Sequence, residues 1–317
     1  MCGIVAYIGP KEAYPIIIKG LKRLEYRGYD SAGVALLNKS GALNIYKKQG
    51  KVANLEADVD GKDTTGYAGI GHTRWATHGA PNDVNAHPHY SEDGDIALIH
   101  NGIIENYDAL KHELIKLGYT FKSETDTEVL TYLIDDIKKK SNVSIAEAVR
   151  LALQHVVGAY AIVVLSKENP TQLVAARKSS PLVVGIGKEG DFYLASDATP
   201  IVEYTKRVVY MEDEEIAIVD LNEGLKLYGI DDVAKTPYVQ ELEIQLEALE
   251  KGGYEHFMLK EIHEQPRSIT DCFRGRLNAA EGWVNLGGIK DYEQKMANAN
   301  RIIMIACGTS WHAALVG

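Results

Sequence analysis

Short apolar runs and helical patterns alternate along the first two thirds of the chain. An apolar run of strand length, Cys2 to Ile8, begins the sequence and ends at Gly9-Pro10. Apolar residues then recur at helical spacing between Ala13 and Tyr26. The pattern therefore predicts a strand followed by an amphipathic helix.

The next segments predict further strands and three helices. Val34 to Leu37 and Leu43 to Lys47 are apolar runs on either side of a short polar turn, which is typical of a hairpin. We expect helices over 106–116, 125–139 and 144–155, and further strands over 67–71, 95–100, 161–165, 173–176, 182–186, 192–195, 208–211 and 215–219. Strands, then helices, then strands again indicate a layered α+β domain with two sheets that ends near Leu221.

The last third of the chain is less regular. Residues 222–253 are acidic and weakly patterned, and we interpret them as an interdomain linker with a short helix at 241–250. Later elements are expected as helices on either side of Gln265-Pro266, at 256–262 and 268–277, and as an apolar strand at 302–306. One strand and the start of one helix cannot bury a core. We therefore divide the chain into a first domain, a linker and the truncated beginning of a second domain, at 1–221, 222–253 and 254–317.

Composition narrows the class of protein. The 317 residues are 45% hydrophobic and 25% charged, which is typical of a globular protein with a sizeable core. The net charge of -10 argues against nucleic acid as a partner. No apolar stretch reaches the roughly 18 residues needed to cross a bilayer, and no basic segment precedes the first apolar run. We expect a cytoplasmic protein without membrane contacts.

The cysteines point to chemistry at one position. Cys2, Cys272 and Cys307 are too few and too scattered for a disulfide framework or a metal site, so we expect a reducing compartment and no metal. Removal of Met1 would leave Cys2 with both a thiol and a free α-amine. An amine with a pKa near neutrality can take the thiol proton directly or through one water. The alternative is that Cys2 is a small buried side chain that starts a strand.

A thiol that attacks an acyl carbon needs an oxyanion hole and groups that hold the substrate. Asn101-Gly102 follows a buried strand and offers a side-chain amide and an unobstructed backbone N–H, although the same dipeptide is typical of a hairpin turn. Arg74 can pair with a carboxylate, and Asp126, at the start of a helix, with an ammonium. The alternatives for these two residues are a surface ion pair and an ordinary helix cap.

Five motifs in a fixed order resemble those of the class II, N-terminal-nucleophile glutamine amidotransferases. They are CGIV at 2–5, RGYDSAG at 27–33, HTRWATHG at 72–79, HNGIIEN at 100–106 and SETDTE at 123–128. The resemblance runs from Cys2 to about Val219 and resumes at 260–266 and 307–310. It implies a four-layer αββα sandwich followed by a truncated α/β sugar isomerase domain, and it implies no cofactor.

The resemblance also implies a role for each matching residue. Cys2 would attack the side-chain amide of glutamine to form a glutamyl thioester and release ammonia, and Asn101 and Gly102 would form the oxyanion hole. Arg74 would hold the α-carboxylate of the substrate and Asp126 its α-ammonium. The remaining expected site residues are Thr77 and His78, which line the site, Arg27 and His72, which support it, and Trp75, which gates an ammonia tunnel unless it is an ordinary core aromatic.

A last motif lies near the end of the chain. The loop Cys307, Gly308, Thr309 and Ser310 precedes a helical pattern, where hydroxyl groups and helix N–H groups can bind phosphate or simply cap the helix. The resemblance implies contact with the phosphate of fructose 6-phosphate, which accepts the ammonia in the full-length protein. A homodimer is expected for that protein, whereas the truncated chain can be a monomer. Two alternatives stay open: another class II amidotransferase, or a non-catalytic fragment that binds glutamine or a sugar phosphate.

Overall fold

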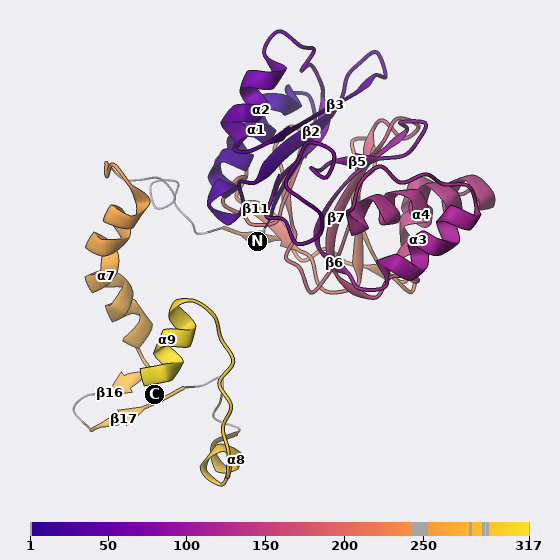
Figure 1. Cartoon of the computed structure of the whole chain (residues 1–317). Coiled ribbons are helices and arrows are strands. Elements are labelled where there is room, and N and C mark those ends of the chain that lie inside the picture. The colour runs from indigo at the N-terminus through magenta and orange to yellow at the C-terminus, as the bar shows by residue number, and fades with distance from the viewer. Residues whose placement is uncertain (1, 243–252, 279–280, 287–288, 290–291, 317) are drawn as a thin grey trace. The chain divides into compact units, whose positions relative to one another are not determined.

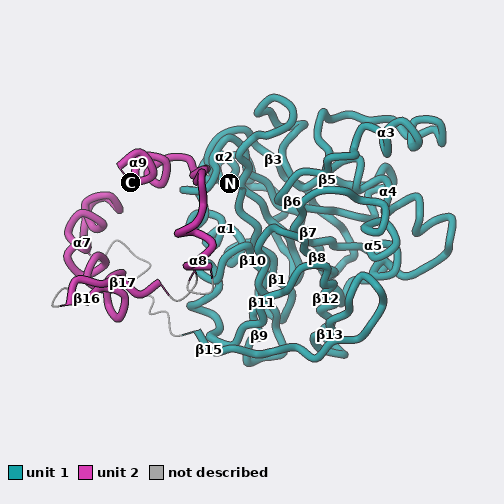
Figure 2. Tube along the Cα trace, turned by 90° about the horizontal axis from the view of Figure 1, so that it is seen from below, with its two compact units in different colours: residues 1–249 teal, residues 250–317 magenta. Residues whose placement is uncertain are grey.

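The chain folds into two compact units. The computed structural model describes residues 2–242, 253–278, 281–286, 289 and 292–316 (Figure 1). The first unit is Met1–Leu249 and the second is Glu250–Gly317 (Figure 2). No helix of the described residues is long and apolar enough to cross a membrane.

Two sheets form the centre of the first unit, and every pairing between their named strands is antiparallel. The eight-stranded sheet has the order β15-β11-β9-β10-β1-β4-β2-β3. Its strands are β1 (Gly3–Ile8), β2 (Ser31–Leu37), β3 (Leu43–Gln49), β4 (Ala68–Arg74), β9 (Val183–Ile186), β10 (Phe192–Ala195), β11 (Arg207–Tyr210) and β15 (Gln240–Glu241). The predicted hairpin is confirmed, because β2 pairs with β3 along its whole length.

The seven-stranded sheet has the order β14-β13-β12-β8-β7-β6-β5. Its strands are β5 (His89–Tyr90), β6 (Ile96–Ile104), β7 (Gly158–Ser166), β8 (Gln172–Lys178), β12 (Glu215–Asp220), β13 (Gly224–Gly229) and β14 (Ala234–Lys235). The sheet therefore continues past Leu221, where the sequence pattern ended it. The segment from 222 was read as linker because its alternation is weak, and β13 is only partly buried.

The alternation of side chains along the strands assigns the faces of the sheets. In β1, Ile4, Ala6 and Ile8 belong to a core that both sheets share, whereas Val5 and Tyr7 pack under the outer helices. Figure 1 shows helices on the outside of both sheets. The fold is a four-layer αββα sandwich, as the sequence resemblance implied.

The helices of the first unit cover the outer faces. α1 (Ala13–Leu24) and α2 (Val52–Val59) pack on the eight-stranded sheet, and α4 (Asp126–Ser141) and α5 (Ile145–Leu153) pack on the seven-stranded sheet. α3 (Tyr107–Lys116) packs against α4, and a 3-10 turn, η1 (Glu25–Arg27), follows α1. Thr125 caps α4 and Ser144 caps α5, each accepting a backbone N–H three residues on. The sequence pattern missed α2, which is short and buries few residues.

The second unit holds the elements α7 (Phe257–Phe273), β16 (Leu277–Asn278), β17 (Trp283–Val284), α8 (Glu293–Ala297) and α9 (Thr309–Val316). α7 continues through Pro266, so the predicted break there is wrong. The predicted strand at 302–306 does not form, and Ile305 is 93% exposed. A strand needs a neighbour for its backbone hydrogen bonds, and none pairs with this segment in the described part of the chain. The helix expected at 241–250 lies mostly outside the described residues.

Candidate active site

The site lies at the end of the core between the two sheets, and strand alternation explains which side chains reach it. Cys2 precedes β1 and continues the inward series of Ile4 and Ala6. β4 turns Ile70 inward, so His72 and Arg74 face the second sheet as well. In β6, Ala97 and Ile99 are inward, so Asn101 is inward too. The sheets therefore bring the thiol, the arginine and the amide together.

One pocket collects seven of the ten residues predicted for the glutamine site. Its lining residues are Cys2, Arg74, Trp75, Thr77, His78, His87, His100, Gly102, Thr125, Asp126 and Thr127. The Cys2 thiol lies against the backbone of Trp75, whose N–H donates to Sγ over 3.2 Å. The Asn101 side chain joins the two sheets, because its Nδ2 donates to the backbone oxygen of Cys2 over 3.2 Å.

The thiol itself is neutral and has no side-chain base beside it. Burial raises the pKa of Cys2, and the Trp75 N–H opposes that effect in part. Within the described part of the chain, Sγ makes hydrogen bonds only with the backbone of Trp75. A base for this thiol must therefore come from outside the side chains of the pocket.

Asn101 and Gly102 lie inside β6 and not in a turn, so the hairpin alternative is wrong. Gly102 has a φ of +134°, and a Cβ there would lie 2.0 Å from the backbone oxygen of Ala159. Only glycine fits this backbone. The strand can therefore present the Gly102 N–H and the Asn101 amide next to each other.

His72 fixes the orientation of the Asn101 amide. Its Nε2 lies 2.9 Å from Asn101 Oδ1 and 3.1 Å from the backbone oxygen of His100. Two oxygen acceptors require a proton on Nε2, so Asn101 Oδ1 accepts and its Nδ2 points to Cys2. Burial lowers the pKa of His72 to about 3, and the ring stacks on His87 at 4.2 Å. His72 is thus a neutral donor and not a proton-transfer group.

Arg74 is a buried cation without an acidic partner. Its guanidinium donates to the backbone oxygens of His78, Gly79 and Ala80, the last two at 3.2 Å and 3.3 Å. No carboxylate of the described residues lies within ion-pair distance of it, and only 4% of Arg74 is exposed. A buried charge of this kind favours an anionic ligand. The alternative of a surface ion pair is therefore wrong.

Asp126 supplies the opposite charge on the same pocket. It is the first residue of α4, and its Oδ2 accepts the backbone N–H of Ile104 over 2.8 Å. The carboxylate is buried and lies 4.0 Å from Nδ1 of His100. Thr125, not Asp126, caps the helix. The carboxylate is held by β6 and remains directed at the pocket.

The remaining predicted residues lie in three separate environments. Trp75 is 50% exposed and packs edge-on against Tyr29 at 5.8 Å, so it is not a core aromatic. Arg27 pairs with Asp197 and is not among the residues that line the pocket. Cys307, Gly308, Thr309 and Ser310 belong to the second unit, where all four are exposed and the last two begin α9. Among the described residues, no group of His, Cys, Asp and Glu could hold a metal ion.

Sequence reasoning missed four residues that line the pocket: His87, His100, Thr125 and Thr127. His100 turns away from the core and meets the start of α4, where its Nδ1 lies 3.0 Å from Thr127 Oγ1. Three of the four could have been found from the sequence, because His100, Thr125 and Thr127 lie within the motifs that contain Asn101 and Asp126. The resemblance placed both motifs at one substrate, and the fold adds the direct contact between His100 and Thr127.

The comparisons with known proteins agree with this geometry. The family described as "glutamine amidotransferase domain" matches residues 38–226. The chain is 61% identical to glutamine–fructose-6-phosphate aminotransferase (isomerizing) of Bacteroides thetaiotaomicron, over 100% of this chain and 52% of the relative. It is 56% identical to the enzyme of the same name from Chlorobaculum tepidum, again over 100% of this chain and 52% of the relative. The chain thus spans about half the length of the curated relatives it matches.

Solved structures give the same relationship. Glutamine phosphoribosylpyrophosphate amidotransferase from B. subtilis has a TM-score of 0.62 and 28% identity, and the match covers 72% of this chain and 49% of that one. The family match spans more than half of the chain, and the fold is the sandwich that the motifs implied. The chain therefore belongs to the class II glutamine amidotransferases.

Proposed function

We propose that this chain hydrolyses L-glutamine to glutamate and ammonia through a thioester on Cys2. The observation that carries the proposal is the pocket that combines a thiol with a buried, unpaired Arg74 and a buried Asp126. One cation and one anion suit the carboxylate and ammonium of an amino acid. Thr77 and His78, which line the same pocket, complete the contacts with the substrate.

The first half of the reaction forms the thioester. After removal of Met1, the α-amine of Cys2 takes the proton from Sγ, and the thiolate attacks the amide carbon of glutamine. The Asn101 Nδ2 and the Gly102 N–H stabilise the negative charge that develops on the amide oxygen. The carbon–nitrogen bond then breaks, and the departing nitrogen takes the proton back from the α-ammonium and leaves as ammonia.

The second half of the reaction restores the enzyme. Water gives a proton to the α-amine and attacks the thioester carbon, with the same donors holding the oxyanion. The carbon–sulfur bond breaks, glutamate leaves, and the proton returns to Sγ. His72 acts through Asn101 as a positioning residue, because it contacts the amide and not the thiol.

In the whole protein, we expect the ammonia to reach fructose 6-phosphate and give glucosamine 6-phosphate. The curated relatives carry that acceptor in their names, and this chain matches about half of their length. In this proposal, the first unit, whose sheets continue through β15, is the glutaminase domain, and residues 254–317 are the beginning of a sugar isomerase domain whose loop at 307–310 binds the sugar phosphate. The half-exposed Trp75 is the proposed gate of the ammonia path, and a cytoplasmic homodimer is the expected state of the whole protein.

The test is glutamate release by protein whose loss of Met1 is verified by intact mass. We expect turnover by the processed chain, background activity for Cys2→Ala, and full activity for Cys272→Ala, which removes an exposed cysteine of the second unit. Glutamate release by Cys2→Ala at the unmodified rate would refute the mechanism. Glutamine binding without turnover in processed protein would instead favour the non-catalytic alternative.

A further inference from the structure

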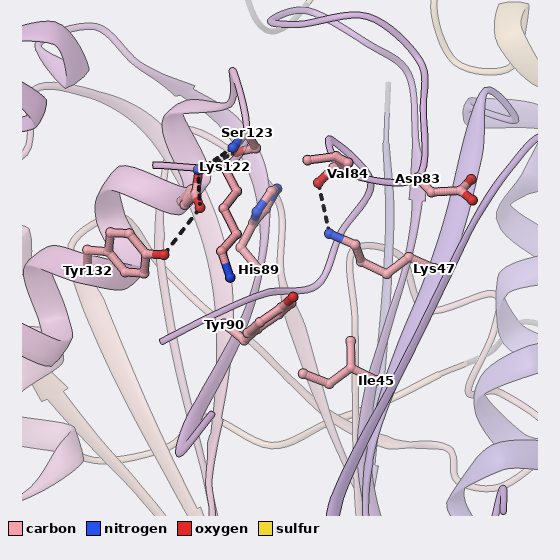
Figure 3. A pocket seen from close by; sticks show the side chains of 10 residues that line it. Ile45, Lys47, Asp83, Val84, His89, Tyr90, Lys122, Ser123 and Tyr132 are labelled. Carbon is pink, nitrogen blue, oxygen red and sulfur yellow. Dashed lines mark hydrogen bonds between the residues drawn. The ribbon is translucent and has the colours of Figure 1, made fainter. Parts of the chain in front are cut away.

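A second, larger pocket lies on the first unit and has no role in the chemistry above. Its volume is about 470 Å³. It opens between β3, the last strand of the eight-stranded sheet, and β5, the last strand of the seven-stranded sheet, with the start of α4 as a further wall (Figure 3). The residues that line it are Ile45, Lys47, Asp83, Val84, His89, Tyr90, Lys122, Ser123, Glu128 and Tyr132.

Two lysines enter this pocket with unused hydrogen-bond donors. Lys47 Nζ donates to the backbone oxygen of Val84 over 2.9 Å and lies 5.8 Å from the ring centre of Tyr90. An ammonium has three N–H groups, so two of them remain available. On the opposite wall, the Lys122 ammonium has no hydrogen bond or ion pair with any described residue. Figure 3 shows both side chains extending into the space between the walls.

The two acids of the pocket are already occupied. Glu128 accepts the backbone N–H groups of Lys122 and Ser123, the Ser123 hydroxyl and the Tyr132 hydroxyl, at 2.7–3.3 Å. Asp83 accepts the backbone N–H of Gln49 over 2.6 Å and pairs with Lys48, and Figure 3 shows its carboxylate turned away from Lys47. Both carboxylates of this pocket therefore already have donors, whereas two ammonium groups keep free N–H donors, which favours an anionic ligand.

The size and walls of the pocket define the rest of the ligand. A single water occupies about 30 Å³ of liquid, so a bare inorganic anion would fill only a small part of this space. Ile45, Val84 and the rings of Tyr90 and Tyr132 give the pocket apolar surface for an organic body. Carboxylates are best matched by the planar fork of arginine, whereas lysines bind phosphate as separate point charges. Two lysines on facing walls suit a dianionic head.

We propose that this pocket binds a small organic phosphate, with the phosphate between Lys47 and Lys122 and the organic part against Tyr90. Burial lowers the pKa of Lys47 to about 8, so the amine is still charged at neutral pH and would gain from an anion beside it. The site is separate from the active-site pocket but adjoins it. His89 Nε2 lies 2.9 Å from the hydroxyl of Thr125, which lines the active-site pocket.

The test is calorimetric titration of phenyl phosphate into the intact chain at near-neutral pH and moderate salt. We expect saturable one-to-one binding that weakens roughly tenfold or more in Lys47→Met and in Lys122→Met. Lys226→Met is the matched control, because Lys226, on β13, pairs with Glu223 and lines neither pocket. Its affinity for phenyl phosphate should equal that of the unmodified chain. Inorganic phosphate should bind more weakly with the same dependence on both lysines, and phenol should not bind.

Several results would overturn the proposal. The first two are a failure of phenyl phosphate to bind saturably and an unchanged affinity in the variant that lacks both lysines. The other two are tighter binding of benzoate than of phenyl phosphate and displacement of phenyl phosphate by glutamine. Lys122 is exposed, so Lys122→Met gives a valid result even if Lys47→Met does not fold. Because the readout is binding and not turnover, it is independent of the proposed glutaminase activity.

Discussion

The hydrogen bond from His72 to Asn101 makes the proposed oxyanion hole depend on a residue that does not line the pocket. His72→Phe tests this dependence. Phenylalanine keeps an aromatic ring that can stack on His87, which is 4.2 Å away, but it cannot donate to Asn101 Oδ1. The amide then loses the contact that directs its Nδ2 toward Cys2.

The expected effect follows from what the amide supplies. Complete loss of one oxyanion donor costs about 100- to 1,000-fold in kcat. A donor that is present but free to rotate should cost less, and we expect kcat for glutamate release to fall about 10- to 100-fold, or about 1.4–2.7 kcal/mol. The KM for glutamine should change little, because Arg74 and Asp126 keep their own hydrogen bonds.

The assay is steady-state glutamate release by processed protein, with urea unfolding as the control for stability. His72→Gln should recover much of the lost kcat, since its side-chain amide can donate from a similar position. In a double-mutant cycle, His72→Phe should add little to Asn101→Ala, because both changes disable the same group. The reasoning would be refuted by an unchanged kcat in His72→Phe, or by effects of the two changes that multiply independently.

Three further predictions concern other parts of the site. Gly102→Ala should destabilise the fold by more than about 1 kcal/mol and abolish turnover, measured by urea unfolding and glutamate release, because its Cβ would lie 2.0 Å from the Ala159 oxygen at a positive φ. Arg74→Lys should raise the KM for glutamine more than it lowers kcat, because a lysine cannot form the same two-pronged contact with a carboxylate. The free energy of unfolding should fall as the pH drops from 6.5 toward 3, and His72 alone should contribute about 1.4 kcal/mol per pH unit to this fall. Burial lowers the pKa of His72 from 6.5 to about 3, so the unfolded chain binds more protons in that window; pH-dependent urea unfolding measures this. A flat profile there, a tolerated Gly102→Ala or an Arg74→Lys variant with normal KM would each contradict its prediction.

Most of the first unit could be predicted from the sequence because its strands bury one or both faces and leave a clear pattern. The exceptions have physical causes. β13 is partly exposed at the side of its sheet and shows little alternation, so it resembled a linker. The segment at 302–306 has the composition of a strand, but composition cannot supply the neighbouring strand that completes its hydrogen bonds.

The five motifs predicted more of the candidate site than the local pattern of hydrophobic and polar residues did. Asn-Gly usually marks a turn, and only the pairing of β6 with β7 places Asn101 and Gly102 inside a strand. The resemblance gave His72 only a supporting role, and its contact with Asn101 could not be predicted because it joins two sheets. His87 lines the same pocket but lies outside the five motifs, eight residues after the motif at 72–79 ends.

The packing of the central core affects the proposed reaction, because it sets the relative positions of the site residues. Cys2 directly precedes a strand of the eight-stranded sheet and the proposed oxyanion donors lie in the seven-stranded sheet, so their separation depends on the spacing of the two sheets at that end. Many residues between the sheets are alanines, including Ala6, Ala35, Ala97 and Ala161, which let the sheets approach closely. Such a core cannot accept a larger side chain without shifting its walls. A substitution deep in this core would therefore move Asn101 relative to Cys2, and it would lower kcat without changing any residue that touches glutamine.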